Sequence, residues 1–317
     1  MSTTTAATDP AAAGYSQRVA IPKFGIEVGP FPHLRAERER LVDLTWSHFD
    51  ARPIGATIGG ELQGLDLGGD LSDEVIAEIR QALLDYKVIV FRDQSLDAEA
   101  HLAFASRFGD LEIHPFLPAN ATNPELVRFE KSKQVGGFEN GWHSDVSWRE
   151  VPSLGAVLHA VEVPPSGGDT LFCDMYTAYE ALDPATRDQI DGLYAIHDYS
   201  QVFGYGIPDD QKAEMREKYP LVRHPVVRTH PETGRKLLYV NRFFVSHIDG
   251  MEADESHALL DRLCRQADII EFQFRHQWRD GDVVFWDNRA VQHYATSDYW
   301  PATRIMERAS IIGDRPV

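Results

Sequence analysis

The chain has 317 residues, of which 43% are hydrophobic, 31 are basic and 49 are acidic, so its formal net charge is −18. A chain of this length and composition can bury one large core or two small ones. The acidic balance argues against nucleic acid and against a membrane surface as partners, because both bind basic patches. An anionic small molecule would have to be held by a few local arginines.

The N-terminal end is expected to lie outside the folded core. Residues 1–14 are rich in Thr, Ala and Pro, and they lack the basic and apolar segments of a signal peptide, so we expect a mobile tail. The rest of residues 1–50 shows no firm periodicity and is expected to be an irregular extension. A single catalytic domain would follow at 51–317. Cys173 and Cys264 are too few for a disulfide framework, which favours a cytoplasmic protein.

The first half of the expected domain alternates strands and helices. Val75, Ile79 and Leu83 recur at helical spacing behind Ser72, a suitable N-cap residue, and so predict an amphipathic helix. The other elements expected here are strands at 54–58, 87–92, 154–163 and 169–173, and a helix at 97–108 ended by Gly109.

The second half is richer in strands. Helices are expected at 176–193, 209–218 and 254–266, a hairpin from 222–228 and 236–240, and strands at 272–278, 283–286 and 304–312. Many short strands between Gly/Pro turns, with helices concentrated early and in one insertion, indicate a mostly β fold with some α: a double-sheet core buttressed by helices.

One short stretch, Gly141–Trp148, offers metal-binding chemistry. It places an imidazole and a carboxylate two residues apart, at His143 and Asp145. On an extended strand, such side chains project from one face, roughly 6.6 Å apart along the backbone. With a histidine from elsewhere they would form the 2-His-1-carboxylate triad of non-haem iron(II) oxygenases. The same spacing recurs in two other pairs, His48 with Asp50 and His247 with Asp249. Spacing alone therefore cannot select the site.

A candidate for the third ligand follows a buried strand late in the chain. This residue is His293, although taken alone it would more often be a hydrogen-bonded core histidine. Arg304 and Arg308 come next, four residues apart on a half-buried strand, so both guanidinium groups would face the same way. That arrangement is costly unless anions neutralise it, and guanidinium binds carboxylate-like or sulfo groups through paired hydrogen bonds.

Five motifs occur in a fixed order along the chain. They are WHSDV at Trp142–Val146, PPSGGDTLF at Pro164–Phe172, HPVVRTHP at His224–Pro231, WDNRAVQHYA at Trp286–Ala295 and RIMERA at Arg304–Ala309. Together they resemble the taurine dioxygenase and phenoxyacetate dioxygenase family of iron(II)- and 2-oxoglutarate-dependent oxygenases. The resemblance extends from about Ile54 to the C-terminus, and it implies a double-stranded β-helix, or jelly-roll, core.

The resemblance also implies a reaction and a set of roles. His143, Asp145 and His293 would bind iron(II), and 2-oxoglutarate would chelate the metal through its C1 carboxylate and keto oxygen. Its distal carboxylate would meet Thr170 and Arg304. With O2, oxidative decarboxylation would release succinate and CO2 while a substrate C–H bond is oxidised. Hydroxylation beside a sulfonate or a sulfate oxygen would expel sulfite or sulfate.

The substrate is less well defined by the resemblance. His114 and Arg308 match the positions that hold the sulfonate of taurine in the family. Leu117, however, stands where taurine dioxygenase has a tyrosine, and Phe138 opens the stretch that replaces its Asp/Asn-rich approach to the iron motif. We therefore expect a more apolar anion, preferably an alkyl sulfonate or alkyl sulfate, with taurine a further candidate. Phe138 and Phe243 are the expected substrate contacts.

Three alternatives remain open at this stage. The same chemistry could act on a phenoxyalkanoate or another carboxylate. Two histidines and one aspartate would also suit a zinc hydrolase, and a non-catalytic β-barrel binding protein would belong to another functional class. We further expect a homo-oligomer, either a dimer or a tetramer.

Overall fold

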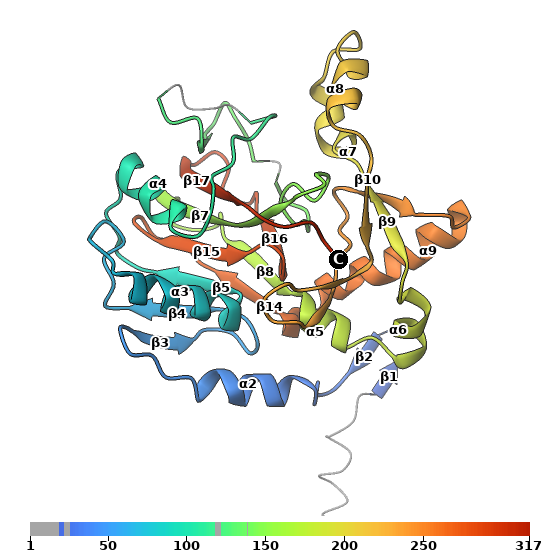
Figure 1. The fold of residues 1–317 in the computed structure, drawn as a ribbon, viewed down its shortest axis with the longest axis horizontal. Coiled ribbons are helices and arrows are strands. Elements are labelled where there is room, and N and C mark those ends of the chain that lie inside the picture. Colours follow the sequence, from blue (N-terminus) through green and yellow to red (C-terminus); the bar gives the residue numbers. More distant parts are fainter. Residues whose placement is uncertain (1–18, 22–25, 118–121, 138) are drawn as a thin grey trace, which may run out of the picture.

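Two β-sheets form the centre of the computed structural model, which describes residues 19–21, 26–117, 122–137 and 139–317. The seven-stranded main sheet has the order β3 (Asp50–Pro53), β4 (Gly60–Gln63), β5 (Val88–Phe91), β15 (Val283–Asp287), β7 (Ser153–Glu162), β17 (Arg304–Ile312) and β6 (Leu126–Lys131). The three-stranded minor sheet has the order β14 (Gln273–His276), β8 (Thr170–Asp174) and β16 (Val291–Ala295). Figure 1 shows these strands surrounded by helices. This arrangement confirms the expected mostly β, double-stranded β-helix (jelly-roll) core with helical support.

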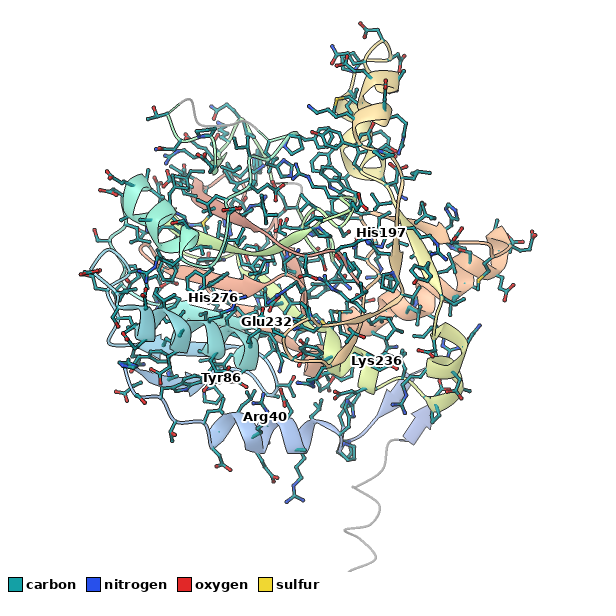
Figure 2. All side chains as sticks on the ribbon, viewed as in Figure 1. Arg40, Tyr86, His197, Glu232, Lys236 and His276 are labelled. Atoms are coloured by element: carbon teal, nitrogen blue, oxygen red, sulfur yellow. The ribbon has the colours of Figure 1, made fainter. Side chains whose placement is uncertain are left out.

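The two sheets pack face to face through buried aromatic side chains. Phe172 of β8 contacts Trp286 of β15, with ring centroids 5.7 Å apart, and both belong to the inner hydrophobic core. Side chains fill the space between the elements in Figure 2, where the labelled His197 and His276 are fully buried. The inner faces of the two sheets therefore create the buried environment in which the candidate site lies.

Helices cover the outer face of the main sheet. They are α3 (Asp73–Tyr86) and α4 (Ala98–Ser106), while α2 (Leu34–Val42) runs along the β3 edge of the sheet in Figure 1. The predicted N-cap is confirmed, because the hydroxyl of Ser72 accepts a hydrogen bond from the Val75 backbone N–H. Asp97 caps α4 in the same way through Ala100. Apolar side chains of α3 and α4 form an outer core with those of β5 and β15.

A long insertion between β8 and β14 carries the remaining elements. In chain order they are α5 (Met175–Glu180), α6 (Pro184–Ile190), β9 (Tyr194–His197), α7 (Ser200–Phe203), η1 (Gly204–Gly206), α8 (Lys212–Lys218), β10 (Val222–Pro225), β11 (Val227–Thr229), β12 (Lys236–Leu238), β13 (Val245–Ile248), α9 (Ala253–Cys264), η2 (Arg265–Asp268) and η3 (Ile270–Phe272). Helix α8 projects away from the two sheets in Figure 1, and α7 lies between it and the rest of the molecule.

Three expected elements differ from the structure. The strand predicted at 54–58 is wrong, because the strand ends at Pro53 and Ile54 then closes a tight loop with the carbonyl of Gly59, whose φ is +94°. The helix predicted at 176–193 is divided in two, because Asp183 and Pro184 begin a new helix. In the predicted hairpin β11 does pair with β12, but β10 pairs with β9 instead.

The structure also contains elements that the sequence pattern did not reveal. They include β1 (Val19–Ile21), β2 (Ile26–Val28), α2, β4, β6, β9, α7, β13 and β16. Among the described residues, no helix is long and apolar enough to cross a membrane. The mobile tail expected at residues 1–14 lies outside the described part of the chain, as does Phe138.

Candidate active site

One cavity between the two sheets brings the predicted site residues together. Eight of them line it: His114, His143, Asp145, Thr170, Phe243, His293, Arg304 and Arg308. The ninth, Phe138, lies outside the described residues, so its contact with a substrate stays a prediction. This cavity is therefore the candidate active site.

The Gly141–Trp148 stretch is not the extended strand that its spacing suggested. Only His143 pairs with a strand, through an isolated bridge in which its backbone N–H and C=O both bond His293 of β16 at 3.1 and 2.8 Å. The chain then turns, and Val146 adopts a φ of +45°. A turn anchored on β16, and not strand alternation, thus directs Asp145 toward the two histidines.

The three candidate ligands converge on one point. His143 Nε2 lies 3.9 Å from one oxygen of Asp145, and His293 Nε2 lies 3.8 Å from the other. One ligand atom from each residue lies within 4.8 Å of the others, and all three residues are buried. His143 Nδ1 lies 2.7 Å from the Gly141 carbonyl, which places its proton on Nδ1 and leaves the Nε2 lone pair free. This donor set fits a divalent metal ion with open coordination positions.

Phe243 fixes the orientation of the first ligand. Its ring stacks on His143, with centroids 4.9 Å apart and an interplanar angle of 13°. Gly141 makes this approach feasible, because a Cβ at that position would overlap the Phe243 ring. The glycine before the WHSDV motif is therefore required by packing, which sequence analysis did not detect.

Asp145 is held by two further side chains. Asn288 accepts a hydrogen bond from the Asp145 backbone N–H at 2.7 Å and donates one to its carbonyl at 3.0 Å. Arg308 Nη1 donates to both carboxylate oxygens, at 3.0 and 3.2 Å. Burial alone would raise the pKa of the Asp145 carboxyl, but Arg308 and the neighbouring histidines hold that pKa well below its usual range. The group is therefore a carboxylate, as a metal ligand must be.

Arg304 lines the cavity as a buried cation that forms no ion pair with the described part of the chain. Its Nε and Nη2 atoms are buried and have no hydrogen-bond partner among the described residues, and burial lowers the pKa of its guanidinium. Trp278 donates its indole N–H to the hydroxyl of Thr170 at 3.0 Å, which leaves the hydroxyl proton free to donate elsewhere. Gly168, with φ +72°, would place a Cβ within 3.2 Å of the Arg304 side chain. This end of the cavity is prepared for an anionic group.

His114 and Arg308 form a second polar group, which shares the cavity with Arg304. The Nδ1 atom of His114 accepts backbone N–H bonds from Phe116 and Leu117 at 3.2 and 3.1 Å, so its proton resides on Nε2. Burial, assisted by Arg308, lowers the pKa of His114 to about 3. His114 is therefore a neutral hydrogen-bond donor. The Nε atom of Arg308 is buried and has no partner among the described residues.

Apolar side chains line the rest of the cavity. They are Leu117, Phe129, Val146, Trp148, Leu158, Val202, Phe203, Phe244, Trp286, Ala295 and Met306. Val202 and Phe203 come from α7 in the insertion, and sequence analysis missed them because the signal for this four-residue helix is short. Lys131 and Glu139 also line the cavity and pair with each other at 2.9 Å.

The other two His-x-Asp pairs, His48 with Asp50 and His247 with Asp249, lie at the protein surface. His48 contacts Glu78 at 2.7 Å, and Asp249, the partner of His247, pairs instead with Arg223 at 2.6 Å. The geometry therefore selects His143 and Asp145 from the three pairs with this spacing.

Comparison with known proteins agrees with this geometry. Residues 50–310 match the family model described as "Taurine catabolism dioxygenase TauD, TfdA family". An alpha-ketoglutarate-dependent sulfate ester dioxygenase of Pseudomonas putida is 33% identical over 84% of this chain and 91% of its own length. An (S)-phenoxypropionate/alpha-ketoglutarate-dioxygenase of Sphingobium herbicidovorans is 36% identical over 84% of this chain and 96% of its own length.

A solved structure shares the fold. A taurine dioxygenase from Burkholderia xenovorans superposes with a TM-score of 0.75 at 36% sequence identity, and the match covers 86% of this chain and 91% of that protein. The similarity therefore covers most of this chain and most of that protein.

Proposed function

Because the chain belongs to the taurine catabolism dioxygenase TauD, TfdA family, we propose its substrate from the chemistry of the cavity: a small organic anion with an apolar body. Family membership makes the protein an oxidoreductase, a dioxygenase that uses iron(II), 2-oxoglutarate and O2. An alkyl sulfate ester is the preferred substrate, and an alkyl sulfonate is the next candidate. The observation that carries this proposal is a pair of buried arginines in one largely apolar cavity, Arg304 and Arg308, each with nitrogens that no described residue bonds.

His143, Asp145 and His293 are the residues that would hold the iron. Three protein ligands leave the remaining positions of the metal open for the co-substrates. When bound, iron(II) supplies the chemistry that couples decarboxylation of 2-oxoglutarate, to succinate and CO2, with oxidation of a substrate C–H bond. The protein contributes orientation: the Gly141 carbonyl fixes the His143 tautomer, and Phe243 fixes its ring.

Arg304 and Thr170 are the residues that would bind the distal carboxylate of 2-oxoglutarate. The two unpartnered Arg304 nitrogens can donate to both oxygens of a carboxylate, and the free proton of the Thr170 hydroxyl can add a third bond. Trp278 and Tyr299 flank the guanidinium, each with its ring centroid 5.8 Å away. Such a desolvated site strengthens these bonds and orients the co-substrate toward the metal ligands.

His114 and Arg308 are the residues that would bind the anionic head of the substrate. Arg308 already gives Nη1 to Asp145, so Nε and Nη2 are the donors that remain for a substrate. A sulfo group has three terminal oxygens and can offer a separate one to each of Arg308 Nε, Arg308 Nη2 and His114 Nε2, whereas a carboxylate has only two oxygens for these three donors. The partly engaged arginine and the neutral histidine therefore favour a sulfate or sulfonate head.

The apolar lining favours an alkyl chain over the aminoethyl group of taurine. Leu117, Phe129 and Phe203 surround the cavity, and an ammonium group would lose its hydration against such side chains without compensation. Hydroxylation at the carbon that bears the sulfate oxygen would give an unstable hemiacetal ester. This product would break its C–O bond to release sulfate and an aldehyde.

A phenoxyalkanoate is the second candidate. The Phe116 ring stacks on Phe203 of α7 with centroids 4.8 Å apart, so an aromatic substrate would meet an aromatic wall. The phenoxypropionate dioxygenase relative supports this candidate. Neither a zinc hydrolase nor a non-catalytic binding protein would need the dicarboxylate site at Arg304, so both are less well supported.

Three further expectations accompany this function. We propose that residues 51–317 form one catalytic domain after an extension at 1–50, and that the enzyme is a cytoplasmic homodimer or homotetramer. Cys173 and Cys264 are both free and buried, which suits a reducing compartment. Light scattering after size-exclusion chromatography would measure the assembly, and a monomeric mass at working concentration would contradict that part of the proposal.

The substrate is tested by succinate release with matched compounds. Purified enzyme with iron(II), 2-oxoglutarate and O2 would be given hexyl sulfate, hexanesulfonate, heptanoate, phenoxyacetate, 2-phenoxypropionate and taurine. We expect the largest stimulation with hexyl sulfate and a smaller one with hexanesulfonate. Stimulation by the carboxylates alone would overturn the substrate proposal while leaving the reaction class intact.

A further inference from the structure

A second group of potential metal ligands lies on the opposite face of β17 from the cavity. It consists of His101 of α4, His159 of β7 and Glu307 of β17. The neighbours of Glu307 along the strand, Met306 and Arg308, line the cavity. Since successive residues of a strand point to opposite faces, Glu307 faces outward, toward α4. The same alternation separates His159 from the cavity-lining Leu158.

The three residues are brought together by pairing and packing. His159 and Glu307 are direct partners in the β7–β17 ladder, and α4 lies across both strands as part of the outer core. One ligand atom from each residue lies within 4.8 Å of the others. His101 is fully buried, and His159 is 7% exposed. This is a preformed cluster, held by three separate elements.

The hydrogen bonds of His101 leave one of its nitrogens unused. Its Nε2 lies 3.0 Å from the carbonyl of Val157 and must donate, because a carbonyl only accepts. The Nδ1 atom then carries a lone pair, and it is buried with no partner among the described residues. His159 Nδ1 is likewise buried without a partner there. A buried nitrogen without a hydrogen bond is costly, and the two rings that carry these nitrogens have their centroids only 6.0 Å apart.

A metal ion would satisfy both nitrogens at once. A histidine whose other ring nitrogen donates to a backbone carbonyl is the usual form of a metal-binding histidine. Glu307 adds a carboxylate, which now accepts from Arg128 at 2.7 Å. The Arg128 side chain is 40% exposed and can turn into solvent when a cation replaces it. Two imidazoles and one carboxylate favour zinc(II) or a similar transition-metal ion over calcium or magnesium, which prefer oxygen ligands.

We propose that His101, His159 and Glu307 form a second, structural site for a divalent transition-metal ion such as Zn2+. The ion would join α4 to the outer face of β7 and β17. The inner face of β17 presents Arg304 and Arg308 to the cavity, so this site would stabilise the strand that binds the co-substrate and substrate anions.

Equilibrium dialysis of metal-free protein against Zn2+ tests this proposal. A His143→Ala, Asp145→Ala variant removes two ligands of the first site, and we expect it to retain one Zn2+ per chain. Adding His159→Gln should abolish that binding. Adding Glu307→Gln, a substitution that keeps the size of the side chain, should weaken Zn2+ binding by about tenfold or more. Adding His247→Gln, at an exposed histidine of β13, is the matched control and should leave it unchanged.

Two results would overturn the proposal. One is the absence of bound Zn2+ from the His143→Ala, Asp145→Ala variant while it remains folded. The other is full retention of Zn2+ after His159→Gln or Glu307→Gln. A second readout is the melting temperature, because an ion that binds only the folded state stabilises it. Zn2+ should raise the melting temperature of the His143→Ala, Asp145→Ala variant. It should not raise that of the variant that also carries His159→Gln.

Discussion

Nη1 of Arg308 lies 3.0 and 3.2 Å from the two carboxylate oxygens of Asp145. One guanidinium thus joins the proposed substrate end of the cavity to the proposed metal-binding triad. This contact keeps Asp145 ionised, and it turns the remaining Arg308 donors toward the cavity. Substrate binding and metal binding should therefore be coupled through this residue.

Replacing Arg308 should impair substrate binding more than 2-oxoglutarate binding. Arg308→Lys keeps the charge but loses the planar donor set, and loss of one charge-assisted hydrogen bond costs about 1.5–3 kcal/mol. We expect the KM for the alkyl sulfate to rise roughly 10- to 100-fold. Arg223→Lys, in a surface ion pair with Asp249, is the control. An equal rise in the KM of both substrates would contradict the assignment.

Replacing Arg304 should have the reverse effect. Arg304→Lys removes the paired donors that lie beside Thr170, so the KM for 2-oxoglutarate should rise roughly 10- to 100-fold, with a smaller effect on the alkyl sulfate. Steady-state kinetics with each substrate varied in turn would measure this. An unchanged KM for 2-oxoglutarate would show that its distal carboxylate binds elsewhere.

A methyl group at Gly141 should disturb the first metal ligand through Phe243. Gly141→Ala forces the ring of Phe243 from its stacked position on His143. We expect kcat to fall about tenfold, by misorientation of the imidazole. Adding Phe243→Ala should restore part of the loss. If the double variant loses as much activation free energy, measured from kcat, as the two single variants together, the two positions act independently.

Asn288 should act as a positioning residue for Asp145. Asn288→Ala removes both of its hydrogen bonds to the Asp145 backbone, and loss of such support typically reduces metal affinity about 10- to 100-fold. Activity should be recovered in part at high iron(II). A variant whose iron(II) dependence matches that of the wild type, but whose kcat is low, would refute this role.

Acid should destabilise the metal-free protein through its buried neutral histidines. Burial lowers the pKa of His224 to about 4 and that of His114 to about 3, against about 6.5 in an unfolded chain. Between these values the unfolded state binds more protons, so stability falls as pH decreases from about 6.5 to 4. Each histidine contributes at most roughly 1.4 kcal/mol per pH unit to the slope of the free energy of unfolding against pH.

Urea unfolding at several pH values measures this effect. His224→Asn removes one titrating group and should reduce the slope between pH 6 and 4.5, whereas replacement of the exposed His247 should not. If His224→Asn leaves the slope of the unfolding free energy against pH unchanged, the folded protein does not hold this histidine in its neutral form.

The sequence predicts those features that depend on local chemistry. A strand at 304–312 and a helix capped by Ser72 are both present, because alternation and capping act within a few residues. The candidate site residues can be selected from the sequence because the motifs contain the residue types that bind a metal ion and two anions, namely histidine, aspartate and arginine. Their approach in space depends on the insertion and on the turn at Val146, and local patterns contain no information on either.

The failures have the same physical origin. The residues at 54–58 are apolar enough for a strand, but the left-handed Gly59 closes a loop there. His143 looks like part of a strand, yet its only strand partner is His293, 150 residues later. Val202 and Phe203 line the cavity only because α7 folds back over it, which no short-range signal could indicate.

The most direct test of the central claim is the product balance with one alkyl sulfate. Purified enzyme with iron(II), 2-oxoglutarate, O2 and hexyl sulfate should form succinate, sulfate and hexanal in equal amounts. Omission of 2-oxoglutarate, or the His143→Ala substitution, should abolish all three. Sulfate released together with hexanol, at a rate that does not depend on 2-oxoglutarate, would show that the site is a hydrolase and would contradict the account.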